Sequence, residues 1–141
     1  MSDSAYAGDV TPQEAWDLLT REPKAKLIDV RTRPEWLFVG VPDLGKLGKK
    51  PLFVEWQMFP SMQVDPQFAE HLRQAGAESD APLLFLCRSG ARSKAAAIAL
   101  TRLGFTRCYN VGGGFEGPLD AGRHRGRTEG WKASGLPWVQ E

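Results

Sequence analysis

Apolar segments of strand length alternate along this chain with segments that carry the pattern of a helix. Candidate strands cover 26–31, 52–56, 83–87 and 107–111, and candidate helices cover 12–21, 33–38, 66–75 and 92–103. Such alternation favours an α/β domain with a mainly parallel sheet, because parallel neighbours are joined by crossover helices. In these sheets reactive groups gather beyond the carboxyl ends of the strands.

Local signals place the ends of several helices. Thr11 is a predicted N-cap with Pro12 at the first helical position, and Glu14 completes a capping box. Gly104 is the predicted residue after the helix over 92–103. A further short helix is predicted around 129–133.

Composition limits the class of protein. The chain has 141 residues, 42% hydrophobic and 25% charged, which suits a single globular domain. The net charge of +1 gives no argument for binding nucleic acid or a membrane. No apolar run approaches the roughly 18–20 residues of a membrane span, and Met1–Tyr6 has no signal-peptide pattern. Two cysteines suit a reducing compartment, so we expect a soluble cytoplasmic protein.

One strand ends on a cysteine that is placed for chemistry. The apolar run from Leu83 ends at Cys87, and a short loop with two arginines and a glycine leads into an alanine-rich helix. A thiol facing a helix N-terminus is easily converted to thiolate, because free backbone N–H groups and the helix dipole stabilise negative charge there. Cys87 is therefore the predicted nucleophile, and a buried structural cysteine is the alternative.

Several short motifs, in this order and spacing, resemble a single-domain rhodanese-like sulfurtransferase. They are Asp29-Val30-Arg31, Glu35-Trp36, the loop from Cys87 to Ser93, Gly104-Phe105, Val111 to Gly114, and Gly130 to Pro137. The resemblance implies a rhodanese-like three-layer domain over 1–141, with a mainly parallel central sheet flanked by helices. It also implies that Cys87 takes a sulfane sulfur as a persulfide and passes it to a thiophilic acceptor.

The same resemblance assigns roles around Cys87. It implies that the donor, a small anion such as thiosulfate or a persulfide, is bound by Arg88, Ser89, Gly90, Ala91, Arg92, Ser93 and Arg31. It implies that Asp29 braces the loop, although a strand-end ion pair between Asp29 and Arg31 is an equal alternative. No cofactor is implied. The acceptor is a thiol or a protein, and we expect a monomer or a weak dimer.

Two segments depart from the family pattern. An insertion near 41–50 is rich in glycine and lysine and lacks the histidine common in the family, and another near 117–129 contains the basic cluster Arg123 to Arg127. Both could lie near the mouth of the pocket. The basic cluster is either a solvated loop or a gate that attracts an anionic donor or an acidic partner.

The remaining candidate groups have simpler interpretations. Cys108 lies within a strand candidate with no basic loop after it, so we predict a core thiol, with a resolving role as the alternative. His71 and His124 have no second ligand at metal spacing, so no metal is predicted. The glycines at 112–114 are not followed by the Lys-Ser/Thr of a phosphate loop, which favours a turn beside the Cys87 loop.

Other functions compete with sulfur transfer. Cysteine phosphatases and arsenate reductases also place a cysteine and an arginine around an oxyanion, in a loop one residue longer than the four residues between Cys87 and Arg92. The shorter loop suits one sulfur atom better than a phosphate. A rhodanese-like module that carries or senses persulfide without turnover is the other alternative.

Overall fold

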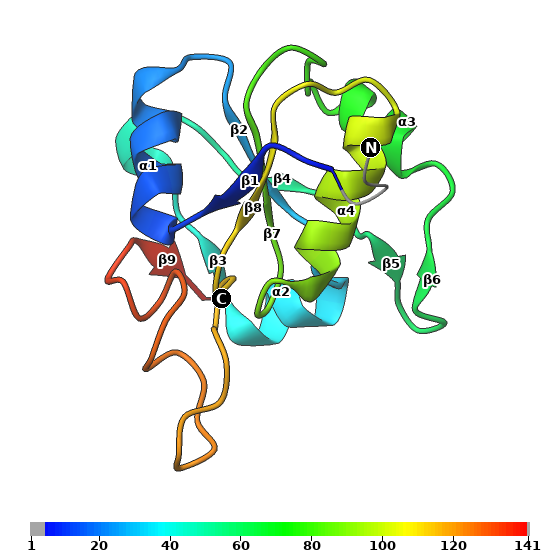
Figure 1. Cartoon of the computed structure of the whole chain (residues 1–141). Coiled ribbons are helices and arrows are strands. Elements are labelled where there is room, and N and C mark those ends of the chain that lie inside the picture. Colours follow the sequence, from blue (N-terminus) through cyan, green and yellow to red (C-terminus); the bar gives the residue numbers. More distant parts are fainter. Residues whose placement is uncertain (1–4, 141) are drawn as a thin grey trace.

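Five parallel strands form the central sheet of the computed structural model, which describes residues 5–140 (Figure 1). Their order is β1-β8-β7-β2-β4, so the strand that leads to Cys87, β7, is the middle one. The strands are β1 (Gly8–Val10), β2 (Lys26–Asp29), β4 (Leu52–Phe53), β7 (Leu83–Leu86) and β8 (Cys108–Val111), and the helices are α1 (Pro12–Arg21), α2 (Arg33–Val39), α3 (Phe68–Gln74) and α4 (Ala91–Arg102). The predicted α/β class with a parallel sheet is confirmed.

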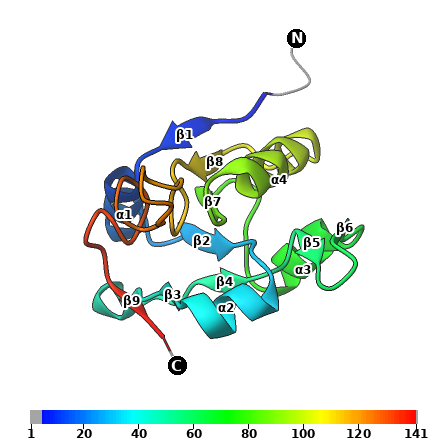
Figure 2. The ribbon, with the colours of Figure 1, turned by 90° about the horizontal axis from the view of Figure 1, so that it is seen from below.

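Strand β7 is buried on both sides, because successive side chains point to opposite faces of the sheet. Leu83 and Phe85 pack with α3 and α4. Leu84 and Leu86 pack with α1 and with the buried Trp131 of the C-terminal segment. The result is three layers, seen end-on in Figure 2, with α1 on one face and α3 and α4 on the other.

The helix ends follow the sequence signals. The Thr11 hydroxyl accepts from the N–H of Glu14 at 3.1 Å, and the Glu14 carboxylate accepts from the N–H of Thr11 at 2.8 Å, as a capping box requires. α4 ends at Arg102, and Gly104 follows with φ of 97°. A positive φ suits glycine because no Cβ clashes there, so the predicted stop is confirmed.

One local prediction is wrong, and one strand was missed. The tail from Glu129 to Ala133 forms a bend followed by turns instead of a helix, and Gly130 and Gly135 both have positive φ. The fully buried Trp131, whose Nε1 donates to the Pro137 carbonyl at 2.7 Å, fixes this segment by tertiary contacts. The three-residue strand β1 was not predicted, since so short a strand leaves no periodic pattern.

Short elements complete the fold. β3 (Val41–Pro42) pairs antiparallel with β9 (Trp138–Val139), β5 (Gln57–Met58) pairs antiparallel with β6 (Gln63–Val64), and a 3₁₀ turn covers Gly45–Leu47. No helix of the described residues is long and apolar enough to cross a membrane. Of the segment Met1–Tyr6, on which the signal-peptide prediction rests, residues 1–4 lie outside the described part of the chain.

The segment near 41–50 leads away from the Cys87 end of the sheet. β4 runs parallel to β2, so the chain must return to the amino ends of the strands before β4 begins. There the Lys49 ammonium group donates to the carbonyls of Leu19, Glu22 and Ala25 at 2.7, 2.8 and 3.1 Å. The expectation that this whole insertion lies near the pocket mouth is therefore wrong for its second half.

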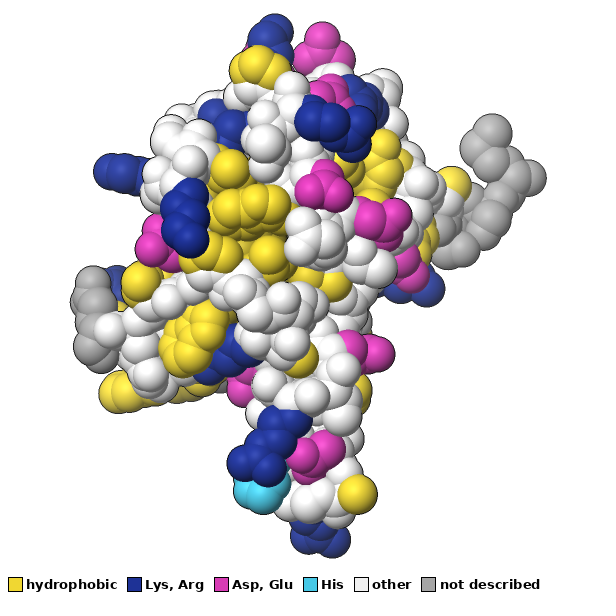
Figure 3. Space-filling model, turned by 90° about the vertical axis from the view of Figure 1, so that its left-hand side faces the viewer, with side chains coloured by type: hydrophobic (Ala, Val, Ile, Leu, Met, Phe, Trp, Pro, Cys, Tyr) yellow, Lys and Arg dark blue, Asp and Glu magenta, His cyan; other side chains and the backbone are white. Residues whose placement is uncertain are grey.

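The segment near 117–129 projects beyond the carboxyl ends of the strands (Figure 1). Its base is closed by Arg125, which donates to the Gly117 carbonyl at 2.8 Å, and by a hydrogen bond from the Gly126 N–H to the Glu116 carbonyl. Its tip is folded around the Asp120 carboxylate, which accepts from two backbone N–H groups. Figure 3 shows that this projection carries basic, acidic and histidine side chains together.

Candidate active site

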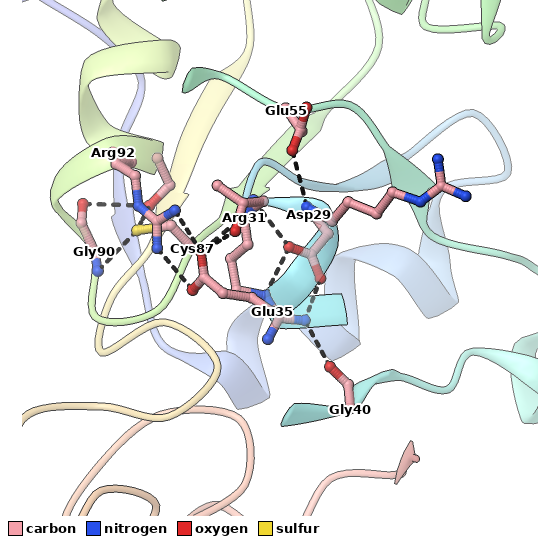
Figure 4. Close-up of polar contacts among 11 residues, drawn as sticks. Asp29, Arg31, Glu35, Gly40, Glu55, Cys87, Gly90 and Arg92 are labelled. Atoms are coloured by element: carbon pink, nitrogen blue, oxygen red, sulfur yellow. Dashed lines mark hydrogen bonds and ion pairs between the residues drawn. The ribbon is translucent and has the colours of Figure 1, made fainter. Parts of the chain in front are cut away.

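Cys87 follows β7 directly, and its side chain faces the first turn of α4 (Figure 4). The residue is 1% exposed. Gly90, the N-cap of α4, has φ of 120° and donates its N–H to the Cys87 Sγ at 3.1 Å. A positive φ at this position requires glycine, since a Cβ would strain the backbone. The loop thus aims a backbone donor at the sulfur, as an anion-binding turn does.

The Cys87 loop is fixed from the other side by the turn that follows β8. The Cys87 carbonyl accepts from the N–H of Phe115 at 2.8 Å. The next carbonyl, of Arg88, accepts from the N–H groups of Glu116 and Gly117 at 3.0 and 3.1 Å. The glycines at 112–114 therefore form a turn beside the active-site loop, in agreement with the sequence analysis.

Arg92 is held by a carboxylate that the sequence analysis did not assign to the site. Its guanidinium group makes two parallel bonds to Glu35 of α2, at 2.7 and 2.9 Å. Both side chains are about one-fifth exposed. Burial favours the neutral form of Glu35, but hydrogen bonds from Arg92 and Thr32 outweigh it and lower the pKa of the carboxyl to about 2. The pair joins α2 to the start of α4 over the sulfur.

This ion pair predicts an acid-sensitive contribution to stability. Because the pKa of Glu35 is about 2 in the folded protein against a usual 4.5, its stabilisation is complete above pH 4.5 and is lost as the pH falls towards 2. Glu35→Gln should lower the free energy of unfolding at pH 6 by about 2–3 kcal/mol. Urea unfolding at several pH values measures this, and the difference between the two proteins should shrink steadily below pH 4.5.

Glu22→Gln is the matched control, because Glu22 makes a similar bidentate pair with Arg107 on a more exposed surface. The pH dependence of its effect should be smaller, since water screens the exposed pair. A difference between wild type and Glu35→Gln that stays constant from pH 6 to pH 2.5 would contradict the assignment.

Asp29 and Arg31 form a second, fully buried ion pair at the end of β2. The Arg31 Nε and Nη2 donate to the two Asp29 oxygens at 2.9 and 2.6 Å, and both side chains are 0% exposed. Nη2 also donates to the Gly40 carbonyl at 2.8 Å, and the guanidinium lies 4.3 Å from the centre of the Phe115 ring. The strand-end ion pair is thus present, and it ties β2 to the end of α2. The donor contact assigned to Arg31 and the bracing role assigned to Asp29 stay predictions.

The other residues predicted to bind the donor divide into two groups. Arg88, Ser89 and Ala91 are exposed at the loop surface. Ser93 is fully buried, and its hydroxyl lies 3.2 Å from the Cys87 Sγ on the core side of the sulfur. The predicted residues therefore surround Cys87 from both the solvent side and the interior.

Cys108 lies in the core, away from any basic loop. It is 0% exposed, and burial raises the pKa of its thiol to about 11. Both cysteines are free thiols. A protonated, inaccessible thiol is a poor nucleophile, which agrees with the predicted core thiol and disfavours a resolving role.

Sequence reasoning missed three side chains that shape the site: Glu35, Asn110 and Asp9. Asn110 accepts from the Ser93 hydroxyl at 2.6 Å and donates to Asp9 at 3.0 Å. Of these three residues, only Glu35 carried a signal in the sequence. It belongs to the family motif Glu35-Trp36, and Thr32 and Glu35 have the spacing of a capping box. That pattern predicts the start of α2, and nothing in it shows that the same carboxylate also holds Arg92.

An α/β protein with a cysteine after its central strand, and a loop from that cysteine into a helix, has the architecture of rhodanese-like proteins. A family model described as the STR4 middle domain matches residues 7–141, and the chain belongs to this family, whose fold is rhodanese-like. The chain is 37% identical over 130 residues to an uncharacterised protein of Rickettsia rickettsii, covering 92% of this chain and 95% of the relative.

Other similarities extend to a curated sulfurtransferase and to two solved structures. The chain is 26% identical over 129 residues to the thiosulfate sulfurtransferase GlpE of Actinobacillus pleuropneumoniae, covering 92% and 90% of the two chains. The crystal structure of Rv0390 from M. tuberculosis superposes with a TM-score of 0.89 at 49% identity, covering 97% and 100%. A polysulfide-sulfur transferase homodimer of Wolinella succinogenes, at TM-score 0.63 and 22% identity over 99% and 82%, shares the fold.

Proposed function

We propose that this protein is a rhodanese-type sulfurtransferase that carries a sulfane sulfur on Cys87. With thiosulfate as donor, the Cys87 thiolate attacks the outer sulfur, the sulfur–sulfur bond of thiosulfate breaks, and sulfite leaves with the bonding electrons. The product is a Cys87 persulfide with one negative charge on its outer sulfur. A thiophilic acceptor such as cyanide or a thiolate then takes that sulfur and restores the thiolate.

The observation that carries this proposal is the Gly90 N–H directed at the Cys87 Sγ at 3.1 Å, at the start of a twelve-residue helix. A backbone donor and the positive end of a helix dipole stabilise charge on sulfur. Arg92 keeps its own charge under all ordinary conditions, because its hydrogen bonds to Glu35 outweigh the effect of burial and raise the pKa of its guanidinium. Similarity to a thiosulfate sulfurtransferase supports the same chemistry.

The remaining parts of the proposal concern binding and organisation. We assign donor recognition to the loop from Arg88 to Ser93 and to Arg31, with Asp29 as the brace. The exposed Arg88 suits an anionic donor, since guanidinium groups bind oxyanions through paired hydrogen bonds. We propose one rhodanese-like domain with insertions near 41–50 and 117–129, acting in the cytoplasm as a monomer or weak dimer.

Intact-protein mass spectrometry tests the function directly. After incubation with thiosulfate and removal of the excess, wild type should gain one sulfur atom, and cyanide should remove it. Cys87→Ala should gain nothing. Cys108→Ala is the matched control and should gain sulfur as wild type does, because Cys108 is buried with a pKa of about 11.

Failure of wild type to gain sulfur from thiosulfate, mercaptopyruvate and glutathione persulfide alike would exclude the proposed function. Release of phosphate from an aryl phosphate, lost in Cys87→Ser, would instead favour the phosphatase alternative. Sulfur loading without repeated transfer to cyanide or a thiol would favour a persulfide carrier.

A further inference from the structure

A chain of hydrogen bonds leads from the buried Cys87 to the exposed Asp9 at the edge of the sheet. The Ser93 hydroxyl on α4 lies 3.2 Å from the Cys87 Sγ and 2.6 Å from the Asn110 Oδ1 on β8. The Asn110 Nδ2 donates at 3.0 Å to Asp9 on β1. Three elements thus meet behind the sulfur, on the side opposite to the exposed part of the loop.

Chemistry fixes the direction of each bond in this chain. Hydrogen bonds from Tyr6 and Asn110 lower the pKa of Asp9, which is therefore a carboxylate that only accepts. Asn110 must then turn its NH₂ group to Asp9 and its carbonyl oxygen to Ser93. That oxygen also only accepts, so the single Ser93 proton must point to Asn110 to form the 2.6 Å bond.

The direction of the Ser93 proton matters for the state of the sulfur. When the Ser93 hydroxyl donates its hydrogen bond to Asn110, its oxygen lone pairs face the Cys87 Sγ and can accept from a thiol S–H. A thiolate needs a donor instead. For Ser93 to donate to it, the hydroxyl must turn away from Asn110 and leave a buried carbonyl oxygen without that partner, which is costly.

We propose that the Asp9–Asn110–Ser93 chain withholds the Ser93 proton from Cys87 and so disfavours the free thiolate relative to the persulfide. In a persulfide the charge lies on the outer sulfur, and the inner Sγ needs no donor from the core side. This inference rests on the proposed role of Cys87 as sulfur carrier. A less stabilised thiolate is also a more reactive nucleophile, so Ser93, Asn110 and Asp9 are positioning residues that favour loading.

Other charges also act on the sulfur and must be held constant in a test. The Gly90 N–H favours charge on Sγ from the loop side. The charged groups that surround the loop and the hydrogen-bond chain are Arg88 of the loop, Arg92 and Lys94 of α4, Glu35 of α2, Asp29 and Arg31 at the end of β2, and Asp9 of β1.

A double-mutant comparison tests the chain through the pH dependence of Cys87 alkylation by iodoacetamide. Asn110→Ala leaves the Ser93 proton two acceptors, the Gly90 carbonyl at 3.2 Å and the Cys87 sulfur at 3.2 Å. The charged thiolate is the stronger acceptor, so the midpoint of the rate profile should fall by about one pH unit. Ser93→Ala made in the Asn110→Ala background should raise the midpoint by a similar amount. In the wild-type background Ser93→Ala should leave the midpoint unchanged or lower it.

This dependence on the background separates the proposal from a merely structural role, which would shift the midpoint by the same amount in both backgrounds. An effect of Ser93→Ala that is equal in both, or an Asn110→Ala midpoint at or above that of wild type, would overturn the proposal. Thr101→Ala is the matched control and should leave the midpoint unchanged, because its hydroxyl bonds to Ala97 within the same helix at 2.8 Å.

Asp9→Ala gives a second background if Asn110→Ala does not fold, since Asp9 is exposed. Without the carboxylate the Asn110 amide can turn its Nδ2 to Ser93 and release the Ser93 proton. The loss of the Asp9 charge affects Asp9→Ala and the double variant Asp9→Ala/Ser93→Ala equally, so these two proteins are compared with each other. Adding Ser93→Ala to Asp9→Ala should again raise the midpoint.

Sulfur loading gives an independent readout. At a fixed ratio of thiosulfate to sulfite, and at a pH above the wild-type alkylation midpoint where free Cys87 is thiolate, the ratio of persulfide to free Cys87 should fall by about tenfold in Asn110→Ala if its thiolate is stabilised by one pH unit. If wild type forms no persulfide, the proposed function fails. The effect of the Asp9–Asn110–Ser93 hydrogen bonds on the Cys87 thiolate is then tested by the alkylation midpoints alone. If wild type loads normally but Ser93→Ala shifts the midpoint equally in both backgrounds, the proposed hydrogen-bond chain fails and the proposed function stands.

Discussion

Replacing Arg31 with leucine should lower the free energy of unfolding by about 3–5 kcal/mol. Arg31 and Asp29 are both 0% exposed and joined by two hydrogen bonds, so the substitution leaves the Asp29 carboxylate buried without its cation. It also removes the donor to the Gly40 carbonyl, which anchors the end of α2. Urea unfolding at pH 7 measures the change.

Two further variants separate the causes. Lys24→Ala removes one partner of the exposed Lys24–Glu78 pair, whose side chains are 64% and 50% exposed, and should change stability very little. The double replacement of Asp29 and Arg31 by leucine should recover part of the loss, since no buried charge is left. A loss below about 1 kcal/mol in Arg31→Leu would show that the buried pair contributes little.

The same substitution should also weaken sulfur loading, through α2. Arg31 holds the Gly40 carbonyl at one end of that helix, and Glu35 near its other end holds Arg92. The Asp29–Arg31 pair thus fixes α2 against β2, and the Glu35–Arg92 pair fixes the Cys87 loop against α2. In Arg31→Leu that still folds, persulfide formation with thiosulfate should be slower than in wild type.

The residues that sequence reasoning placed correctly are those close together in the chain. The loop from Cys87 to Ser93 is continuous, so a strand before it and a helix after it determine its position at the carboxyl end of the sheet. Similarly, the capping box at Thr11 and the stop at Gly104 depend only on neighbouring residues. Such local signals survive in the folded structure because tertiary contacts reinforce them.

The residues that were missed depend on contacts between distant segments. Glu35 lies 57 positions from Arg92, and Asp9 lies 101 positions from Asn110. A single sequence gives the chemistry of each side chain and no record of which distant partner it meets. The tail from 129 to 133 failed for the same reason, because the buried Trp131 and its bond to Pro137 decide its conformation.

Gly114→Ala should abolish most sulfur loading. It should also lower the free energy of unfolding more than a glycine-to-alanine change whose only effect is backbone strain at positive φ. Gly114 has φ of 64°, and a Cβ there would lie 2.5 Å from the Cys87 carbonyl oxygen and 2.6 Å from the Arg88 carbonyl group. These are backbone atoms of the loop that holds the sulfur, so the clash can be relieved only by moving that loop or the turn itself.

Gly76→Ala and Gly104→Ala isolate this clash from backbone strain. Both glycines have positive φ, 102° and 97°, and a Cβ at either meets nothing within 4 Å. Each should therefore lose only about 1–3 kcal/mol from strain and load sulfur like wild type at temperatures where it is folded. Thermal unfolding and intact mass after thiosulfate measure both effects. Equal loading by Gly114→Ala and the two controls would mean that the close approach of this turn does not position Cys87.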